Sequence, residues 1–259
     1  PVPLGRPLSP ANGGPVLVFD ADGDGRLDLL ATRGGAVLPA GSPLYQPELL
    51  LNDGAGGFRP AAPRALPTWR HSTGAIAAAD WDRDGDLDVF IGGRLLPGDY
   101  PMPAPGALWR NDGGNFTDVT AALAASLREI GLVTAALWSD ADADGWPDLL
   151  VALEWGEVRF LRNEQGRGFS DQTTKAGFAS AGTGWWQSLA TADFNGDGLP
   201  DFAVGNLGLN TPYQPSAESP SVLYYGDFKG DDTWQILDAF HEDGRLLPRR
   251  SRRELGAHI

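Results

Sequence analysis

The sequence predicts an all-β fold of repeated, four-stranded antiparallel sheets. An aspartate-rich motif of nine residues recurs four times, and a short apolar run lies on each side of every copy. The 35 Gly and 21 Pro among 259 residues favour many tight turns over long helices. A repeated hairpin is therefore the structural unit that we expect.

The motif has the form D-x-[DN]-x-D-G-x-x-D. Its copies are DADGDGRLD (20–28), DWDRDGDLD (80–88), DADADGWPD (140–148) and DFNGDGLPD (193–201). Their first aspartates are 60, 60 and 53 residues apart, a near-constant period that indicates internal repeats.

The apolar runs predict the strands, because they are five to seven residues long, rich in Val, Leu, Ile and Ala, and bounded by Gly and Asp. The runs before the motif lie at 15–20, 74–80, 133–140 and 187–193. The runs after it lie at 27–32, 87–93, 147–153 and 200–206. A third set lies at 48–58, 107–116, 158–169 and 222–228, and Asn-Asp-Gly in its first two members marks a turn into a fourth strand.

Four-stranded sheets repeated in this way are the blades of a β-propeller. We expect one propeller domain over residues 1–259, with about four blades. The predicted blades span about 15–66, 74–120, 132–174 and 184–240, and 241–259 starts a further segment. One short helix is expected at 122–131. The first residue is Pro1 and the last residues resemble the opening of a helix, so we expect a piece of a longer protein.

The motif has the chemistry of a calcium site. Positions 1, 3 and 5 direct side-chain oxygens inward, position 7 offers a backbone carbonyl, and position 9 closes the cage. Glycine at position 6 permits the sharp turn, and such oxygen ligands suit Ca²⁺. The predicted ligands are Asp20, Asp22, Asp24, Arg26, Asp28, Asp80, Asp82, Asp84, Asp86, Asp88, Asp140, Asp142, Asp144, Trp146, Asp148, Asp193, Asn195, Asp197, Leu199 and Asp201.

About four Ca²⁺ ions are therefore expected, and an acidic turn without metal is the alternative. The loop is not an EF-hand, because that motif needs Glu at position 12 and flanking helices. Position 12 is Ala31, Ile91, Val151 and Val204 here. A degenerate copy, DFKGDDTWQ (227–235), has Lys229 and Gln235 at positions 3 and 9 and is not expected to bind metal.

The composition narrows the classes of partner. A net charge of −14 disfavours nucleic acid, whose phosphates need Lys and Arg, and suits cations. No apolar run reaches the roughly 18 residues of a membrane span, so membrane insertion is not expected. The chain has no cysteine, which excludes disulfides and thiol chemistry.

The four hairpins resemble the FG-GAP/VCBS repeats of integrin α-subunit propellers. The connecting pieces 33–58, 90–120 and 184–210 are more similar to bacterial VCBS-repeat proteins related to cartilage acidic protein 1, the ASPIC/UnbV group. This resemblance implies a calcium-stabilised propeller, usually of seven blades, in secreted or surface proteins. Four blades are counted here, so closure of the ring would need further blades or a partner.

Propeller geometry places the calcium hairpins on one face and the long loops 33–48, 93–106 and 206–220 on the other. Aromatic, arginine and histidine side chains of that second face can stack on sugars or grip peptide side chains. Packing of the loops is the competing explanation. The candidate ligand-binding residues are Tyr45, Trp69, Arg70, His71, Arg94, Tyr100, Trp185, Trp186 and Tyr213.

Three functions stay open at this stage. The first is a calcium-stiffened binding or adhesion module for a protein or glycan, in an extracellular, cell-surface or periplasmic location where calcium is millimolar. The second is the propeller of a carbohydrate-active enzyme related to polysaccharide lyases, for which His71 is the one candidate base. The third is a structural spacer. No nucleophile, zincin or P-loop motif is found in the sequence.

Overall fold

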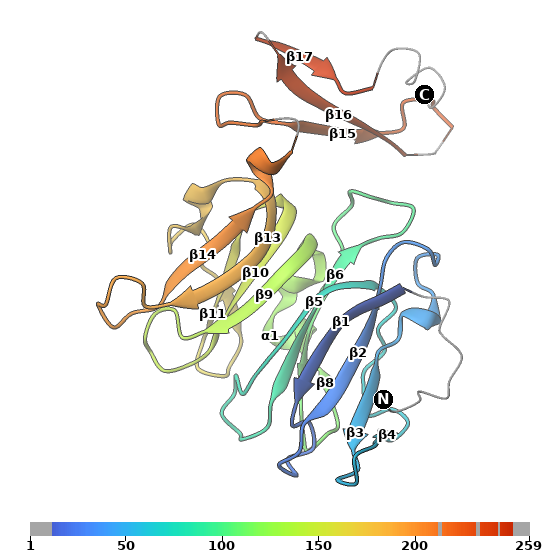
Figure 1. Ribbon diagram of the computed structural model, residues 1–259, viewed down its shortest axis with the longest axis vertical. Coiled ribbons are helices and arrows are strands. Elements are labelled where there is room, and N and C mark those ends of the chain that lie inside the picture. The colour runs from blue at the N-terminus through green and yellow to red at the C-terminus, as the bar shows by residue number, and fades with distance from the viewer. Residues whose placement is uncertain (1–11, 212–213, 232–233, 243, 251–259) are drawn as a thin grey trace. The chain divides into compact units, whose positions relative to one another are not determined.

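The computed structural model describes residues 12–211, 214–231, 234–242 and 244–250 (Figure 1). The chain divides into two compact units, Pro1–Asn206 and Leu207–Ile259. The described residues form four antiparallel sheets of three to six strands, with only short helices between them. The expectation of an all-β protein is confirmed.

The first unit contains three sheets in chain order. The first sheet is β1 (Asn12–Phe19), β2 (Asp28–Gly34), β3 (Glu48–Asn52) and β4 (Phe58–Pro60). The second is β5 (Ser72–Ala79), β6 (Asp88–Leu95), β7 (Gly106–Arg110) and β8 (Thr117–Asp118). The third is β9 (Leu132–Ser139), β10 (Asp148–Gly156), β11 (Arg159–Asn163) and β12 (Phe169–Asp171), extended by β13 (Gly184–Ala192) and β14 (Asp201–Asn206).

A hairpin formed by β13 and β14 begins the fourth repeat. β13 pairs with the far end of β10, where Glu154 lies opposite Trp185 and β11 has already left the sheet. The first strands of successive repeats lie side by side, since β5 contacts both β1 and β9, and β13 contacts β9 (Figure 1). Neighbouring repeats of this unit thus contact each other through their first strands.

The core lies between successive sheets, because alternate residues of a strand face opposite sides. Val89, Ile91 and Trp109 of the second sheet pack with Phe19, Leu30 and Leu51 of the first. Phe90 and Leu108, one residue away on the same strands, pack instead with Leu149, Val151 and Leu161 of the third sheet. A smaller cluster of Ala152, Val158 and Trp186 lies within the third sheet and joins β10 to β13.

The helix expected at 122–131 is two short pieces, the single turn α1 (Thr120–Leu123) and the 3-10 helix η2 (Ala125–Glu129). Ala124 separates them because its backbone, with φ −149° and ψ 52°, is not helical. Leu127 is fully buried between the second and third sheets and anchors the segment. The remaining short helices are η1 (Pro43–Tyr45), η3 (Phe178–Ala181) and η4 (Gly208–Asn210).

The second unit contains a three-stranded sheet of β15 (Val222–Gly226), β16 (Gln235–Glu242) and β17 (Arg245–Pro248). The run at 222–228, expected as the third strand of the fourth repeat, is therefore the first strand of another hairpin. The degenerate loop at 227–235 explains this pairing, because it retains the tight turn that joins two strands in a hairpin. Asp227 accepts the N–H of Gly230 at 2.6 Å, and the Gln235 side chain accepts that of Phe228 at 2.8 Å. Tyr213 and residues 251–259 lie outside the described residues.

Candidate metal centres

The first aspartate of each motif shapes the turn that follows it. The Asp20 carboxylate accepts the N–H groups of Gly23 at 2.9 Å and Gly25 at 2.8 Å. Asp80, Asp140 and Asp193 accept the corresponding N–H at position 6. A short acidic side chain that binds its own downstream backbone is the usual device of such turns.

Two positions of each loop have a left-handed backbone. Position 6 is always glycine, as the sequence predicts, and Gly25 has φ 82°. Position 4 is also left-handed, with φ 62° at Arg83 and 58° at Ala143. The sequence does not reveal this requirement, because only two of the four copies have glycine there.

The fifth position has a role in the turn. Asp24, Asp84, Asp144 and Asp197 each accept the backbone N–H of position 7, at 2.9, 3.0, 3.0 and 2.8 Å. This contact folds the loop around positions 5 to 7, which include Arg26, Trp146 and Leu199. Whether the position 7 carbonyls bind an ion stays a prediction.

The last aspartate is the buried anchor of the first three loops. Asp28, Asp88 and Asp148 are fully buried. One carboxylate oxygen of Asp88 accepts the N–H of Trp81 at 3.3 Å, and the other accepts that of Asn111 at 2.8 Å. Asp28 and Asp148 make the equivalent pairs of bonds. Position 9 thus ties the loop to the third strand of its own sheet.

An asparagine at the end of the third strand links neighbouring loops. The amide of Asn111 donates to Leu87 O of its own loop at 3.1 Å and to Ala21 O of the first loop at 2.9 Å. Asn163 repeats this arrangement with Pro147 O at 3.0 Å and Trp81 O of the second loop at 2.8 Å. The sequence indicated Asn111 only as a turn residue and did not single out Asn163. The repeated Asn-Asp/Glu at 52, 111 and 163 is the signal for them.

Three loops bring carboxylates close enough to share an ion. Oxygens from positions 1, 3 and 9 lie within 4.8 Å of one another in each of the sets Asp20–Asp22–Asp28, Asp80–Asp82–Asp88 and Asp140–Asp142–Asp148. Each set also contains a buried carboxylate oxygen with no hydrogen-bond partner among the described residues, at Asp22, Asp82 and Asp140. Buried unpaired oxygens of this kind are costly unless a cation accompanies them. The donor set fits a hard divalent cation.

The electrostatics of the second and third loops favour binding of a cation. Burial raises the pKa of Asp88 to about 8 and that of Asp148 to about 6, against the stabilising effect of their backbone hydrogen bonds. Burial also raises the pKa of Asp82, helped by the nearby Asp84. A divalent cation would reverse these shifts by favouring the charged carboxylates.

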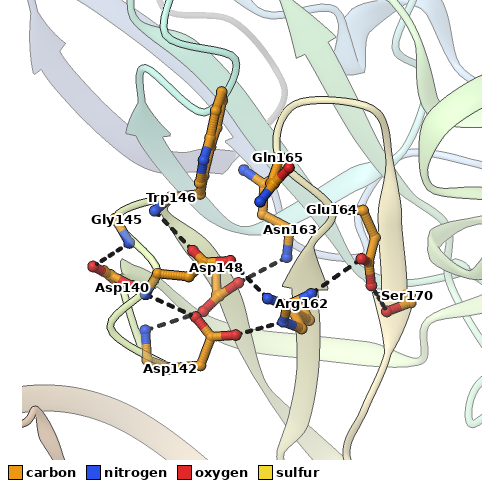
Figure 2. A network of polar contacts seen from close by, with 12 residues as sticks. Asp140, Asp142, Gly145, Trp146, Asp148, Arg162, Asn163, Glu164, Gln165 and Ser170 are labelled. Carbon is orange, nitrogen blue, oxygen red and sulfur yellow. Dashed lines mark hydrogen bonds and ion pairs between the residues drawn. The ribbon is translucent and has the colours of Figure 1, made fainter.

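A basic residue on the third strand contacts two carboxylates of the third loop. Arg162, on β11, contacts Asp142 and donates to Asp144 at 2.6 Å and to Glu164 at 3.1 Å (Figure 2). Burial opposes ionisation of Asp142, but this guanidinium overcomes it and lowers the pKa. Trp146 of the same loop lies 4.6 Å below the guanidinium carbon of Arg83 and so contacts the second loop.

The fourth loop keeps the turn but not the full cage. Asp193 accepts the N–H of Gly196 in the turn, and Asp201 accepts the N–H of Phe194 at position 2. The Asn195 side chain donates to Asp197 at 3.0 Å. Asp201 is only partly buried, and no third-strand asparagine reaches it among the described residues. This loop holds no set of three acidic oxygens in the described part of the chain.

The family comparison matches this geometry. A model of the FG-GAP-like repeat matches residues 20–91 and 140–204, which include all four acidic loops. The chain belongs to the FG-GAP-like repeat family. No curated protein matches the chain.

A solved structure, that of the V. cholerae biofilm matrix protein Bap1, is similar to this FG-GAP-like chain. It has 19% sequence identity, a TM-score of 0.40, and coverage of 91% of this chain and 36% of that chain. The chain thus spans about a third of the length of that protein. No helix in the described residues has the length and apolarity to cross a membrane.

Several candidate ligand residues of this FG-GAP-like chain are packed inside. Tyr45 is fully buried, and its hydroxyl donates to carbonyls of its own loop at Gly35 and Leu38. Trp69 is buried in the first core cluster and donates to Thr73 at 3.0 Å. Trp186 belongs to the third cluster. These three side chains stabilise loops in this structure, which is the packing alternative.

Other candidates lie at the strand ends opposite the acidic loops and form one network. Arg94 pairs with Glu154, which also accepts the Tyr100 hydroxyl. The Trp155 indole N–H donates to that hydroxyl at 2.6 Å, and the Trp155 ring meets Trp185 edge-on at 5.0 Å. The sequence did not single out Glu154 or Trp155, although both follow directly after the apolar run at 147–153.

Arg70 and His71 complete the set of candidates. Arg70 is exposed, and His71 is partly buried against Trp69, with ring centroids 5.0 Å apart. Burial lowers the pKa of His71. No described acidic residue forms an ion pair with this histidine, so the structure adds no partner that would make it a catalytic base.

Proposed function

We propose that this chain is a calcium-stabilised binding module of extracellular type, built as an arc of a β-propeller. The acidic loops would hold Ca²⁺ at one end of the sheets, and the opposite end would present the surface for a protein or glycan ligand. The observation that carries the proposal is the set of three carboxylate clusters, each with a buried oxygen that lacks a hydrogen-bond partner among the residues that the structure describes.

The propeller arc is supported by the packing of the repeats. Successive sheets pack face to face and their first strands lie side by side, as in a radial array. The outer face of the first sheet supports continuation of the array, because Val16 and Val18 are 57% and 54% exposed. Ile76 and Ala78, which occupy the same places on β5, pack against the preceding sheet.

An extracellular location is supported by the calcium chemistry. Modules of extracellular type bind calcium with dissociation constants of about 10⁻⁴ to 10⁻³ M, which suits millimolar calcium outside cells. Membership of the FG-GAP-like repeat family supports the same location. The spacer and the lyase-like enzyme remain the other proposals, and no catalytic pair among the described residues favours the latter.

The test is a calorimetric calcium titration of chelator-treated protein, with a thermal melt at both ends. Three or four sites are expected. At ten to one hundred times the dissociation constant, each site stabilises the folded state by about 1.4 to 2.7 kcal/mol. The control carries Asp22→Asn, Asp82→Asn and Asp142→Asn together. Absence of both heat and stabilisation in the wild type would reject calcium as the ligand.

A further inference from the structure

A pocket of about 420 Å³ lies at the ends of the strands opposite the acidic loops. It is formed where β9 begins, β10 ends and β13 begins, and the loop with Pro101 and Pro103 covers one side. Its volume is within the range of about 300 to 1,000 Å³ that is typical of ligand sites. The space therefore has the size for a side chain or a small ligand.

The charges around this pocket are unbalanced. Glu154 is neutralised by Arg94, and Arg159 is neutralised by Asp171. Two further lining carboxylates, Glu129 and Glu157, have no ion-pair partner among the described residues. The pocket thus carries two uncompensated negative charges.

An aromatic side chain of the pocket is held in a fixed orientation. Trp155 has φ 56°, a left-handed conformation that is unusual for a bulky residue. Its indole N–H is bound by the Tyr100 hydroxyl, and its ring packs edge-on against Trp185. Because the ring is fixed before any ligand arrives, binding against it costs little side-chain entropy.

We propose that this pocket binds the cationic side chain of a lysine or arginine from a protein ligand. The ammonium or guanidinium group would lie between Glu129 and Glu157, with its apolar stem or its charge against the Trp155 ring. The chain's net charge of −14 would attract a basic partner to the whole surface. The inference rests on the proposed function, since it names the ligand of that opposite end.

The experiment uses ¹⁵N-labelled, calcium-saturated full chain and follows the indole N–H signal of Trp155 by NMR. The signal is assigned from its loss in Trp155→Phe. The probes are Nα-acetyl-arginine amide, Nα-acetyl-lysine amide, the uncharged Nα-acetyl-glutamine amide and a neutral hexasaccharide. We expect a saturable shift with the two cationic probes alone.

Variants separate the pocket from general acidity. Glu129→Gln and Glu157→Gln should each weaken binding of the arginine probe, by up to about fivefold. Asp112→Asn removes the same charge from an exposed residue at the acidic-loop end and should leave binding unchanged. Equal binding by both pocket variants and the wild type, or an equal response to the glutamine amide, would overturn the proposal.

A shift of Trp155 caused only by the hexasaccharide would also overturn it, in favour of a glycan site. Calcium-dependent melting is recorded on the same samples. If melting still responds to calcium while no probe binds, the pocket inference fails and the calcium module stands. If melting does not respond to calcium, the proposed function fails.

Discussion

The first three acidic loops and the fourth have the same motif but different surroundings. Asp28, Asp88 and Asp148 are fully buried and held by an asparagine-bearing third strand. Asp201 makes the same contact to the N–H of position 2, at 2.9 Å, yet stays partly exposed. The motif alone therefore suffices for the turn, whereas the third strand and the neighbouring sheet bury its last aspartate.

The largest expected difference comes from removing the last aspartate. Asp88→Ala leaves the buried N–H groups of Trp81 and Asn111 without acceptors, at about 1 to 3 kcal/mol each, so we expect a loss of about 3 kcal/mol or more. Asp201→Ala exposes one N–H to water and should cost about 1 kcal/mol. Urea denaturation in millimolar calcium measures both. Equal losses would show that the third strand adds nothing.

The asparagine link gives the next largest effect. Asn111→Ala removes hydrogen bonds to Ala21 O, Leu87 O and the N–H of Gly114, and should cost about 2 kcal/mol. Asn52→Ala removes the hydrogen bond that the Asn52 side chain donates to Leu27 O and the one that it accepts from Gly54 N–H, and should cost about 1 kcal/mol. Urea denaturation of both variants compares the two losses of stability, and a larger loss for Asn52→Ala would contradict the prediction.

A pH series tests the buried carboxylates. The pKa of Asp88 is about 8 and that of Asp148 about 6 in the folded, metal-free chain, well above the value for an unfolded aspartate. The folded state thus binds more protons, so this contribution is complete below about pH 4 and is lost as the pH rises through 6 and 8. Chelated protein should melt higher at about pH 5.5 than at about pH 8.5.

Asp88→Asn is the control for that series, because it cannot titrate and should flatten the slope. Calcium affinity should change in the opposite direction and increase with pH, since protons compete with the ion. A chelated wild type that melts higher at the alkaline end would contradict the assignment.

Arg162 places a guanidinium beside two carboxylates of the third loop. Its guanidinium occupies the side of Asp142 and Asp144 and repels an incoming cation. Arg162→Gln should tighten calcium binding at this loop about fivefold, or ~1 kcal/mol. Arg167→Gln, in the same turn but bonded to Glu164 O and Gln165, is the matched control. Weaker calcium binding in Arg162→Gln would contradict the argument.

The smallest effect concerns the left-handed fourth position. Ala143 has φ 58°, whereas two other copies have glycine there. Ala143→Gly should stabilise the chain by about 0.5 to 1 kcal/mol, because it relieves the steric cost of the left-handed backbone. Thermal melts in calcium measure it, and destabilisation would show that the alanine methyl group has a packing role.

Much of the fold could be predicted from the sequence, because short apolar runs bounded by Gly and Asp indicate strands locally. The acidic hairpins are set by residues within nine positions, so Asp20 to Asp28 could be read directly. The pairing of 222–228 could not be predicted, because an apolar run does not indicate which strand it pairs with. Tyr45 and Trp69 could not be placed either, since a Pro-rich loop with an aromatic residue has the same sequence whether its ring faces inward or outward.

The part of the site that lies within a single nine-residue motif could be predicted from the sequence. The aspartates at positions 1, 3 and 9 follow from the motif, and the structure brings their carboxylates together in three loops. The links of Asn111 to Ala21 and of Asn163 to Trp81 join residues 90 and 82 positions apart. Contacts at that range depend on how whole sheets pack, which no single stretch of sequence encodes.

The asparagine links also all have the same direction along the chain. Each asparagine reaches backwards, from its own third strand to the loop of the repeat before it, and never forwards in the described residues. Loss of the third repeat would therefore leave Trp81 O without its donor, while the link from Asn111 to the first loop would survive. Through these links, loss of one repeat weakens the loop of the repeat before it and leaves the earlier link in place.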